Sequence, residues 1–160
     1  MDQKTVRELF EYRNGVLYWR KKPANSVNIT KPAGSIGSSG YLSIGIKYKL
    51  YLTHRLIFLY HHGYIPKTLD HINNNKLDNR IENLRPATNS ENIQNSKKSS
   101  INVSGYKGVS FHKNVKKWCA QIRINKKLKY LGCFSTPEEA HQAYCQAADK
   151  HFGEFANHGV

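Results

Sequence analysis

The chain has 160 residues and carries 25 Lys and Arg against 11 Asp and Glu, which gives a formal net charge of +14. Mean hydropathy is -0.66, and no apolar stretch approaches the roughly 18 residues that a bilayer-spanning helix needs, so a membrane protein is excluded. The excess of positive charge favours a polyanion as partner, with a solvated basic surface or a ribosome-associated protein as the alternatives.

The N-terminus and the cysteines bear on the compartment. The first ten residues lack the basic-then-apolar layout of a signal peptide, so we expect an intracellular, reducing compartment. The three cysteines, Cys119, Cys133 and Cys145, lie 14 and 12 residues apart and form no C-x-x-C pair. This spacing implies neither a disulfide framework nor a zinc site, and we expect each cysteine to pack as a small buried side chain.

Residues 8–60 are predicted to be β-rich, with one helix at the end. An Asn14–Gly15 turn leads into a strand, and the stretches 40–47 and 51–58 alternate apolar and polar residues as paired strands do. The second of these stretches is expected to pass into a short helix around residues 54–61.

The stretch 69–95 differs in composition from the rest of the chain. Its 27 residues include one histidine, four carboxylates and eight asparagines, with only scattered aliphatic residues. Polar groups of this kind must be hydrogen-bonded when they are buried, so the stretch cannot form a good core. We interpret it as a functional site.

After this stretch the composition changes to small polar residues with a basic pair, which is typical of a linker. We therefore predict a first domain over residues 1–98, a linker over 99–104 and a second domain over 105–160. In the second domain, a capping-box pattern starts a helix over 137–152. Three strands are expected before it, over residues 108–111, 117–124 and 129–134.

Charge is segregated within the second domain. Residues 101–135 hold eight Lys and Arg and no acid, whereas every acid after residue 101 falls on the predicted helix or at its end. The strands are therefore expected to present a positive face that no acid opposes, which suits contact with nucleic acid.

The spacing of four residues in the asparagine-rich stretch carries a family resemblance. Asp70 and His71 are followed by Asn83 twelve residues after the histidine and by Asn92 nine residues later. With the surrounding residues, L-D-H-I-N-N-N-K-L-D-N-R-I-E-N-L-R and T-N-S-E-N-I-Q-N, the chain resembles the HNH homing endonucleases of the ββα-metal class. The resemblance has its core at about residues 50–98, and it implies hydrolysis of phosphodiester bonds in DNA.

The resemblance implies a role for each residue of this motif. Asp70 and Asn92 would be the metal ligands, a sparse oxygen set that leaves positions for water and phosphate, as Mg²⁺ prefers, with Mn²⁺ as the alternative. His71 would be the general base, because neutral imidazole is suited to proton transfer near neutral pH. Asn83 would brace the loop that orients His71, and Arg85 would contact a phosphate.

Residues 104–157 resemble the Apetala-2/ERF-type DNA-binding domain of plant ethylene-response factors, which is also appended to phage HNH proteins. The matching residues include S-G-Y-K-G-V-S-F, K-K-W-C-A-Q-I-R-I and Y-L-G-C-F-S-T-P-E-E-A. The resemblance implies a three-stranded antiparallel sheet that enters the major groove while the helix backs it. The residues that it implies contact DNA are Lys107, Lys113, Trp118, Arg123, Lys129 and Tyr130.

Two features of this second match qualify what it implies. Trp118 has an alternative reading as a core residue under the sheet. Ser110 and His112 stand where many members of the family have Arg, which leaves fewer side chains that read guanine and implies modest sequence specificity.

The predicted fold class is α+β: a ββα-metal nuclease core behind a β-rich N-terminal segment, and a three-stranded antiparallel sheet packed on one helix. We expect a metal-dependent homing-type endonuclease of a phage or mobile element, acting on double-stranded DNA in the host cytoplasm or nucleoid. With one site per chain, a monomer would nick, and a homodimer would be needed for a double-strand break. The alternatives are a non-catalytic DNA-binding transcriptional regulator and an RNA-associated protein, which the groove-reading sheet argues against.

Overall fold

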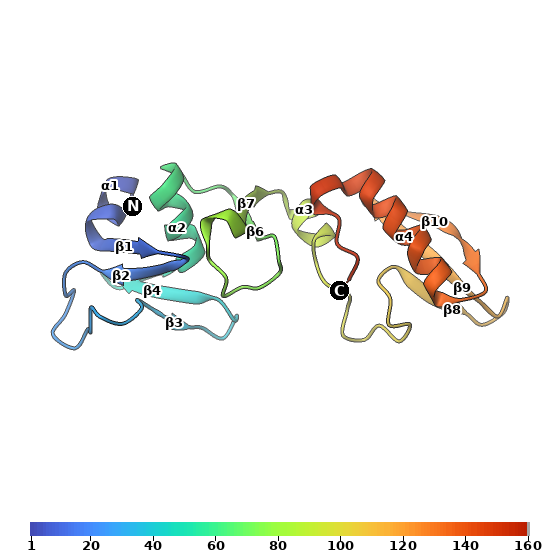
Figure 1. Ribbon diagram of the computed structural model, residues 1–160, viewed down its shortest axis with the longest axis horizontal. Coiled ribbons are helices and arrows are strands. Elements are labelled where there is room, and N and C mark those ends of the chain that lie inside the picture. Colours follow the sequence, from blue (N-terminus) through green and yellow to red (C-terminus); the bar gives the residue numbers. More distant parts are fainter. Residues whose placement is uncertain (160) are drawn as a thin grey trace. The chain divides into compact units, whose positions relative to one another are not determined.

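A computed structural model describes residues 1–159. Two compact units make up the chain, residues 1–88 and residues 89 onward (Figure 1). Helices and strands are mixed in both units, so the α+β prediction is confirmed. In this described part of the chain, no helix is both long and apolar enough to cross a bilayer.

The first unit opens with a helix that the sequence patterns did not predict. Helix α1 (Gln3–Leu9) is capped by Asp2, whose carboxylate accepts a hydrogen bond from the Thr5 amide at 2.8 Å. The helix leads directly into the hairpin of β1 (Phe10–Arg13) and β2 (Val16–Trp19). Its seven residues are fewer than the window over which helical periodicity becomes visible in a sequence.

A three-stranded antiparallel sheet follows, with the order β3-β4-β5. Its strands are β3 (Ser35–Ile36), β4 (Leu42–Ile46) and β5 (Lys49–Leu52). Strand β5 passes without a break into helix α2 (Thr53–His62), as predicted, and Gly63 ends this helix in the left-handed conformation with a φ of 79°.

The last two strands of the first unit carry the predicted site. Strands β6 (Thr68–His71) and β7 (Leu84–Ala87) pair antiparallel, and the loop between them ends in a 3-10 turn (Ile81–Asn83). Leu69 and Leu84 attach these strands to the core. The buried apolar side chains of that core are Val6, Phe10, Leu17, Trp19, Ala33, Ile44, Ile46, Leu56, Ile57, Phe58, Leu59, Leu69 and Leu84.

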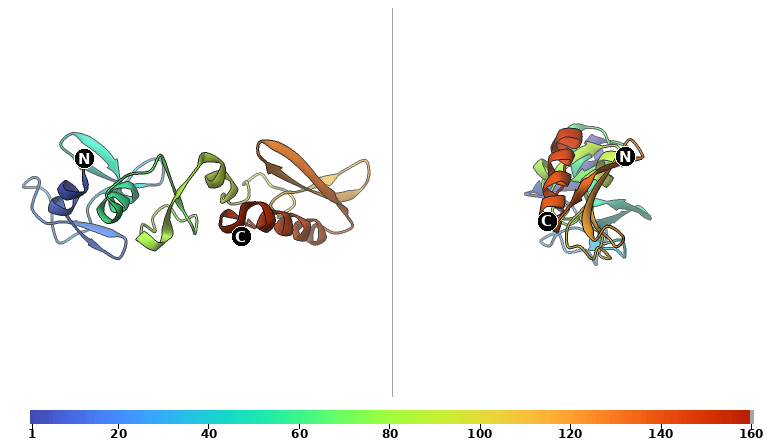
Figure 2. Two further views of the ribbon diagram at one scale, coloured as in Figure 1. Left: turned by 90° about the horizontal axis from the view of Figure 1, so that it is seen from above. Right: turned by 90° about the vertical axis from the view of Figure 1, so that its right-hand side faces the viewer.

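The second unit is a sheet covered on one face by a long helix (Figure 2). Strands β8 (Val109–His112), β9 (Lys117–Ile124) and β10 (Lys127–Phe134) are antiparallel in the order β10-β9-β8, and helix α4 (Pro137–Phe152) packs against them. The three predicted strands and the helix are confirmed, to within two residues at each end.

Helix α4 begins with the predicted capping box and lies close to the sheet. The Glu139 amide donates to the Thr136 hydroxyl at 3.2 Å, and the Glu139 carboxylate accepts from the Thr136 amide at 3.2 Å. A Cβ atom at Gly108, which has a φ of 75°, would collide with the ring of Tyr144. Glycine at this position therefore allows the helix to approach the start of β8.

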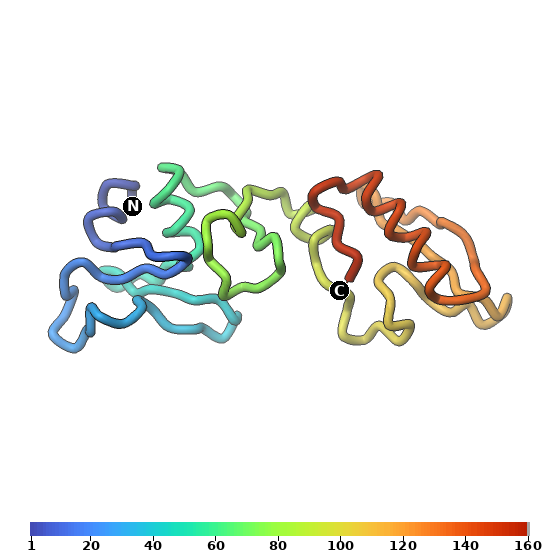
Figure 3. Tube along the Cα trace, viewed as in Figure 1, coloured from blue at the N-terminus to red at the C-terminus, as the bar shows by residue number. Residues whose placement is uncertain are grey.

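Helix α3 (Asn89–Gln94) belongs to the second unit. The Lys107 ammonium donates to the carbonyl oxygens of Gln94 at 2.8 Å and Ser96 at 2.5 Å. Beyond α4 the chain turns back beside α3, where the Asn157 amide donates to the Asn95 side chain at 3.4 Å (Figure 3). These contacts explain why the compact unit begins before the linker that we predicted from composition.

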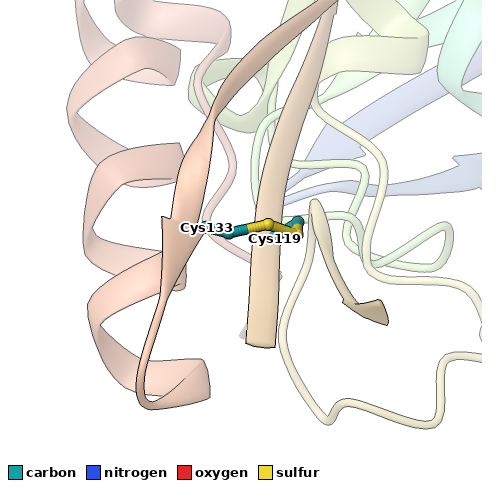
Figure 4. Close-up of a disulfide and its surroundings, with 2 residues drawn as sticks. All are labelled: Cys119 and Cys133. Atoms are coloured by element: carbon teal, nitrogen blue, oxygen red, sulfur yellow. A yellow bond between two sulfur atoms is a disulfide. The ribbon is translucent and has the colours of Figure 1, made fainter. Parts of the chain in front are cut away.

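The expectation that all three cysteines only pack is wrong for two of them. Cys119 on β9 and Cys133 on β10 form a disulfide across the sheet (Figure 4). The two residues are direct partners in the antiparallel register, with Cα atoms 4.0 Å apart. Their separation of 14 residues in the sequence did not predict the disulfide, because only the pairing of the strands brings the two cysteines together. Cys145 on α4 is a free thiol.

Candidate functional site

Strand β6 places Asp70 and His71 inside the first unit. Asp70 is 3% exposed and His71 is 6% exposed. Successive side chains of a strand point to opposite faces, so these two neighbours face different partners. The antiparallel register sets Arg85 across from Asp70 and Leu84 across from His71.

Asp70 forms a buried ion pair with Arg85. Its Oδ2 accepts from the Arg85 Nε at 2.9 Å and lies 2.8 Å from the Arg85 Nη2. Both side chains are almost completely buried, so the guanidinium compensates a carboxylate that would otherwise be costly to desolvate. Arg85, which we predicted to contact a phosphate, is in this structure bonded to the predicted metal ligand.

The imidazole of His71 is held by Asn79. The His71 Nε2 lies 3.0 Å from the Asn79 Oδ1, and Asn79 is only 2% exposed. An amide oxygen can only accept, so in this arrangement Nε2 carries the proton and Nδ1 carries the lone pair of the neutral ring. The nitrogen that faces away from Asn79 is thereby the basic one.

Asn83 ties together the two ends of the loop after β6. Its Oδ1 accepts from the Asn73 amide at 3.0 Å, and its Nδ2 donates to the Asn73 side chain at 3.0 Å and to the Asp78 carbonyl at 2.7 Å. Its carbonyl accepts from the Ile72 amide at 3.0 Å. Within the same loop, the Arg80 guanidinium holds the pKa of the Asp78 carboxyl well below its usual range.

A second histidine packs against the first. The ring of His54, in the first turn of α2, meets the ring of His71 edge-on with centroids 5.1 Å apart, and Tyr41 lies 5.1 Å from His54. Burial, and then the nearby His71 and Arg55, lower the pKa of His54 to about 4. His54 is therefore neutral at physiological pH, and it gives His71 an apolar aromatic wall. Lys76 lies over the ring of Tyr41 at 4.7 Å.

The structure brings together three of the four predicted nuclease residues, Asp70, His71 and Asn83, in the first unit. Asn92 lies on α3 in the second unit, where its side chain is exposed. Its role as a metal ligand stays a prediction.

The sheet of the second unit has two distinct faces. Ala120 and Ile122 of β9 pack towards α4. Gln121 and Arg123 alternate with them along the strand and point to the other face. We call this other face the outer face. By strand register it consists of Ser110, His112, Lys117, Cys119, Gln121, Arg123, Leu128, Tyr130 and Cys133.

The residues that we predicted to contact DNA are divided between these surfaces. Arg123 and Tyr130 lie on the outer face, and Lys113 is exposed in the turn before β9. Trp118 packs on the α4 side against Phe111, with ring centroids 5.0 Å apart, as in the alternative that made it a core residue.

The two other predicted lysines have different surroundings. Lys129 pairs in register with the α4-side residue Ile122 but is exposed. Lys107 is engaged by two backbone carbonyls, and burial lowers its pKa to about 8. Its charge therefore stabilises the attachment of α3 within the second unit.

The chain matches two known families. The chain matches the family model for HNH endonuclease over residues 51–94 and that for the AP2 domain over residues 104–154. A protein of Acanthamoeba polyphaga mimivirus, named an uncharacterized HNH endonuclease, is 37% identical over 131 residues, which is 80% of this chain and 67% of that protein. The chain belongs to the HNH endonuclease family. Both resemblances seen in the sequence are confirmed.

Another relative of this HNH endonuclease is also viral. Protein 3.8 of Escherichia phage T7 is 43% identical over 58 residues, which is 35% of this chain and 48% of that protein. No solved structure matches the chain. A nuclease family and a DNA-binding domain in one chain mean that its partner is DNA.

Sequence reasoning missed two residues of this HNH endonuclease site, Asn79 and His54. Asn79 stood among eight asparagines that are mostly turn formers, so its type carried no signal. His54 lies 17 residues before His71, outside the asparagine-rich stretch, so neither its type nor its position indicated that it belongs to the same site.

Proposed function

We propose that this HNH endonuclease hydrolyses phosphodiester bonds of double-stranded DNA with a divalent metal ion, with His71 as the general base. The observation that supports this best is the hydrogen bond from His71 Nε2 to the buried Asn79, which directs the basic Nδ1 away from the protein's own amide. A base of this kind must be held in one tautomer to take a proton from water.

The residues present suit a hard cation. Asp70 offers carboxylate oxygen, and the loop after β6 is rich in amide oxygens, the donor types that Mg²⁺ and Mn²⁺ take. Asp70 and Asn92 would hold the ion. When bound, it would polarise the phosphate and stabilise the charge on the leaving oxygen.

The protein's own groups then perform the remaining steps. His71 takes a proton from the attacking water, and Asn79 keeps the ring oriented while it does so. The neutral ring of His54 excludes water from one side of His71. Arg85, which is bonded to Asp70 in this structure, would be suited to pair with a phosphate oxygen if Asp70 held the ion, because its planar guanidinium matches two acceptors.

The second unit supplies affinity for the target. Its outer face carries Arg123, Tyr130 and Lys117, and its acids lie on α3, on α4 and just after α4. We infer that the enzyme is of the homing type and acts inside a host cell, since its relatives belong to a giant virus and a phage. One site per chain would nick one strand, and two chains on DNA would make a double-strand break.

The test is incubation of supercoiled plasmid with the protein and Mg²⁺ or Mn²⁺. We expect relaxed or linear product, abolished by EDTA and reduced about a hundredfold or more by His71→Ala, the size of effect expected for a general base. His151→Ala, an exposed histidine on α4, is the matched control and should cleave like the wild type. Binding without cleavage of any DNA, including the genome of the source organism, would instead identify a DNA-binding regulator.

A further inference from the structure

The hairpin of β4 and β5 ends in a two-residue turn with an unusual sequence. Lys47 and Tyr48 have φ angles of 46° and 64°, between the paired residues Ile46 and Lys49. Both central residues of such a turn need positive φ, for which Asn-Gly is strongly preferred. The β1–β2 hairpin of the same unit uses that preferred pair, Asn14–Gly15.

The side chains at this turn contribute little to the fold. Tyr48 has a relative exposure of 110%, as open as in an extended peptide, and Leu50 beside it is 73% exposed. Lys47 and Lys49 are exposed as well. A bulky aromatic residue held in a disfavoured conformation without burial points to a role in binding rather than in stability.

The charge around the turn is of one sign. Between Glu11 and Asp70 the chain contains no Asp or Glu. The whole β3-β4-β5 sheet and helix α2 fall within this interval. The nine basic residues of the interval are Arg13, Arg20, Lys21, Lys22, Lys31, Lys47, Lys49, Arg55 and Lys67.

We propose that the hairpin tip Lys47–Tyr48–Lys49 is a second DNA-contacting element, separate from the sheet of the AP2 domain. The two lysines pair with backbone phosphates of duplex DNA, and the Tyr48 ring lies against the sugars and base edges of a groove. An aromatic residue between two cations fits this partner, because nucleic acid offers both negative charge and flat apolar surface.

The place of the tip within the first unit supports this assignment. Tyr41, whose ring contacts His54 and lies 6.0 Å from the ring of His71, precedes β4, and the tip follows its far end. Six residues of extended chain reach about 20 Å. The tip therefore lies within about 20 Å of Tyr41, a distance that a duplex engaged at His71 can span. The proposal rests on DNA being the substrate, but not on cleavage.

The test replaces the tip with the turn pair that hairpins prefer. In the full chain, Lys47→Asn combined with Tyr48→Gly removes the DNA contacts of Lys47 and Tyr48. The new pair favours the positive φ angles that this turn already has. We expect an unchanged or higher melting temperature, together with about tenfold weaker binding to a fluorescein-labelled random-sequence duplex in EDTA. The slope of log affinity against log salt should fall by about 0.9, the value for one lost phosphate contact.

Lys49→Gln, which leaves the turn untouched, provides a second measurement and should lower the slope by about the same amount. Lys4→Gln on α1 is the matched control for loss of one exposed charge, and it should bind like the wild type. Wild-type affinity and slope in both tip variants would overturn the proposal. The proposal would also be overturned if the tip variants bound duplex DNA like the wild type and lost affinity only for single-stranded RNA. A wild-type chain that binds duplex without cutting it overturns the nuclease proposal alone.

Discussion

At the scale of residues, His71 illustrates how a site depends on a neighbour that composition hides. Its ring is bonded to Asn79, while Asn83, which the motif emphasises, braces the loop that presents Asn79. The two asparagines have separate tasks, one acting on the ring and the other on the backbone. A base that lost its orienting amide would remain present but would sample the wrong tautomer.

We therefore expect Asn79→Ala to lower kcat by about tenfold to a hundredfold with little change in KM. Asn79→Asp should recover much of the rate, because a carboxylate also accepts from Nε2. The added negative charge lies beside the ring and favours its protonated form, so the acidic limb of the pH–rate profile should move to higher pH.

Asn75→Ala is the control for this pair, because the side chain of Asn75 accepts a turn bond from the Leu77 amide at 3.1 Å and is bonded to Leu77, not to the His71 ring. Its pH profile should match that of the wild type. An Asn79→Asp profile that does not move would mean that Asn79 acts on the loop and not on the histidine ring.

His54 makes stability depend on pH. Its pKa is about 4 in the folded protein, against an ordinary value of 6.5 for histidine, so on acidification the unfolded chain takes up the proton first. Stability is unaffected above about pH 6.5, falls between about 6.5 and 4, and levels off below that, a total of roughly 3 kcal/mol for this group. His71, Arg55 and the ring of Tyr41 surround His54, and none of them is an acid that could stabilise its charge.

His54→Phe keeps an aromatic ring and removes the titration. From about pH 7 to about pH 5, the free energy of unfolding of the wild type should fall by about 2 kcal/mol more than that of the variant. Urea titrations followed by tryptophan fluorescence can measure this difference. Parallel pH dependences in the two proteins would contradict the assignment.

At the scale of elements, the β9–β10 hairpin is closed twice, by its turn and by the Cys119–Cys133 disulfide. The disulfide lies on the outer face, so it holds in register the strands that carry Arg123 and Tyr130. A cross-link that closes a loop of about 15 residues stabilises by about 3 kcal/mol, chiefly by restricting the unfolded chain.

Cys119→Ser or treatment with reductant should therefore lower the unfolding free energy of the second unit by about 3 kcal/mol. Thermal melts with and without reductant would show this. Cys145→Ser, which removes the free thiol on α4, should leave the effect of reductant intact. A melting temperature that does not respond to reductant would indicate that the pair is not oxidised in solution.

At the scale of the whole molecule, we propose that the first unit holds the general base and the second unit supplies most of the affinity for DNA, with the metal ligand Asn92 as the part of the chemistry that the second unit carries. The buried Asp70–Arg85 and His71–Asn79 pairs lie in the first unit, and the outer face lies in the second. Recognition by a basic sheet is largely ionic, whereas proton transfer at His71 does not depend on salt bridges to DNA in the other unit.

Arg123→Ala with Tyr130→Ala should thus weaken duplex binding by about tenfold or more and reduce the salt slope by about 0.9. Metal-dependent nicking at saturating protein should stay close to that of the wild type. Gel shifts over a salt series and a plasmid assay give the two readouts. Lys150→Gln on α4 is the control, and loss of nicking at saturation would contradict the division of labour.

Sequence by itself determined much about this protein. The Asp70–His71, Asn83 and Asn92 spacing, the capping box at Thr136 and the β8–β10 strand pattern led to the HNH and AP2 assignments and to the elements of the second unit. Such features are local: caps and alternation depend on residues a few positions apart. The short helix α1 was not predicted, because packing and one N-cap stabilise it and its sequence shows no helical periodicity.

Only the tertiary structure decided which polar side chains meet. Of the eight asparagines in the stretch 69–95, Asn79 bonds to His71, and Arg85 pairs with Asp70. Trp118 packs on the α4 side of its sheet, and Cys119 forms a disulfide with Cys133. Each of these contacts depends on strand register or on the path of a loop, because a shift of one residue moves a side chain to the opposite face. Residue types and spacings therefore predicted the kind of chemistry, whereas the pairing of strands and the path of the loop determined which side chains contact each other.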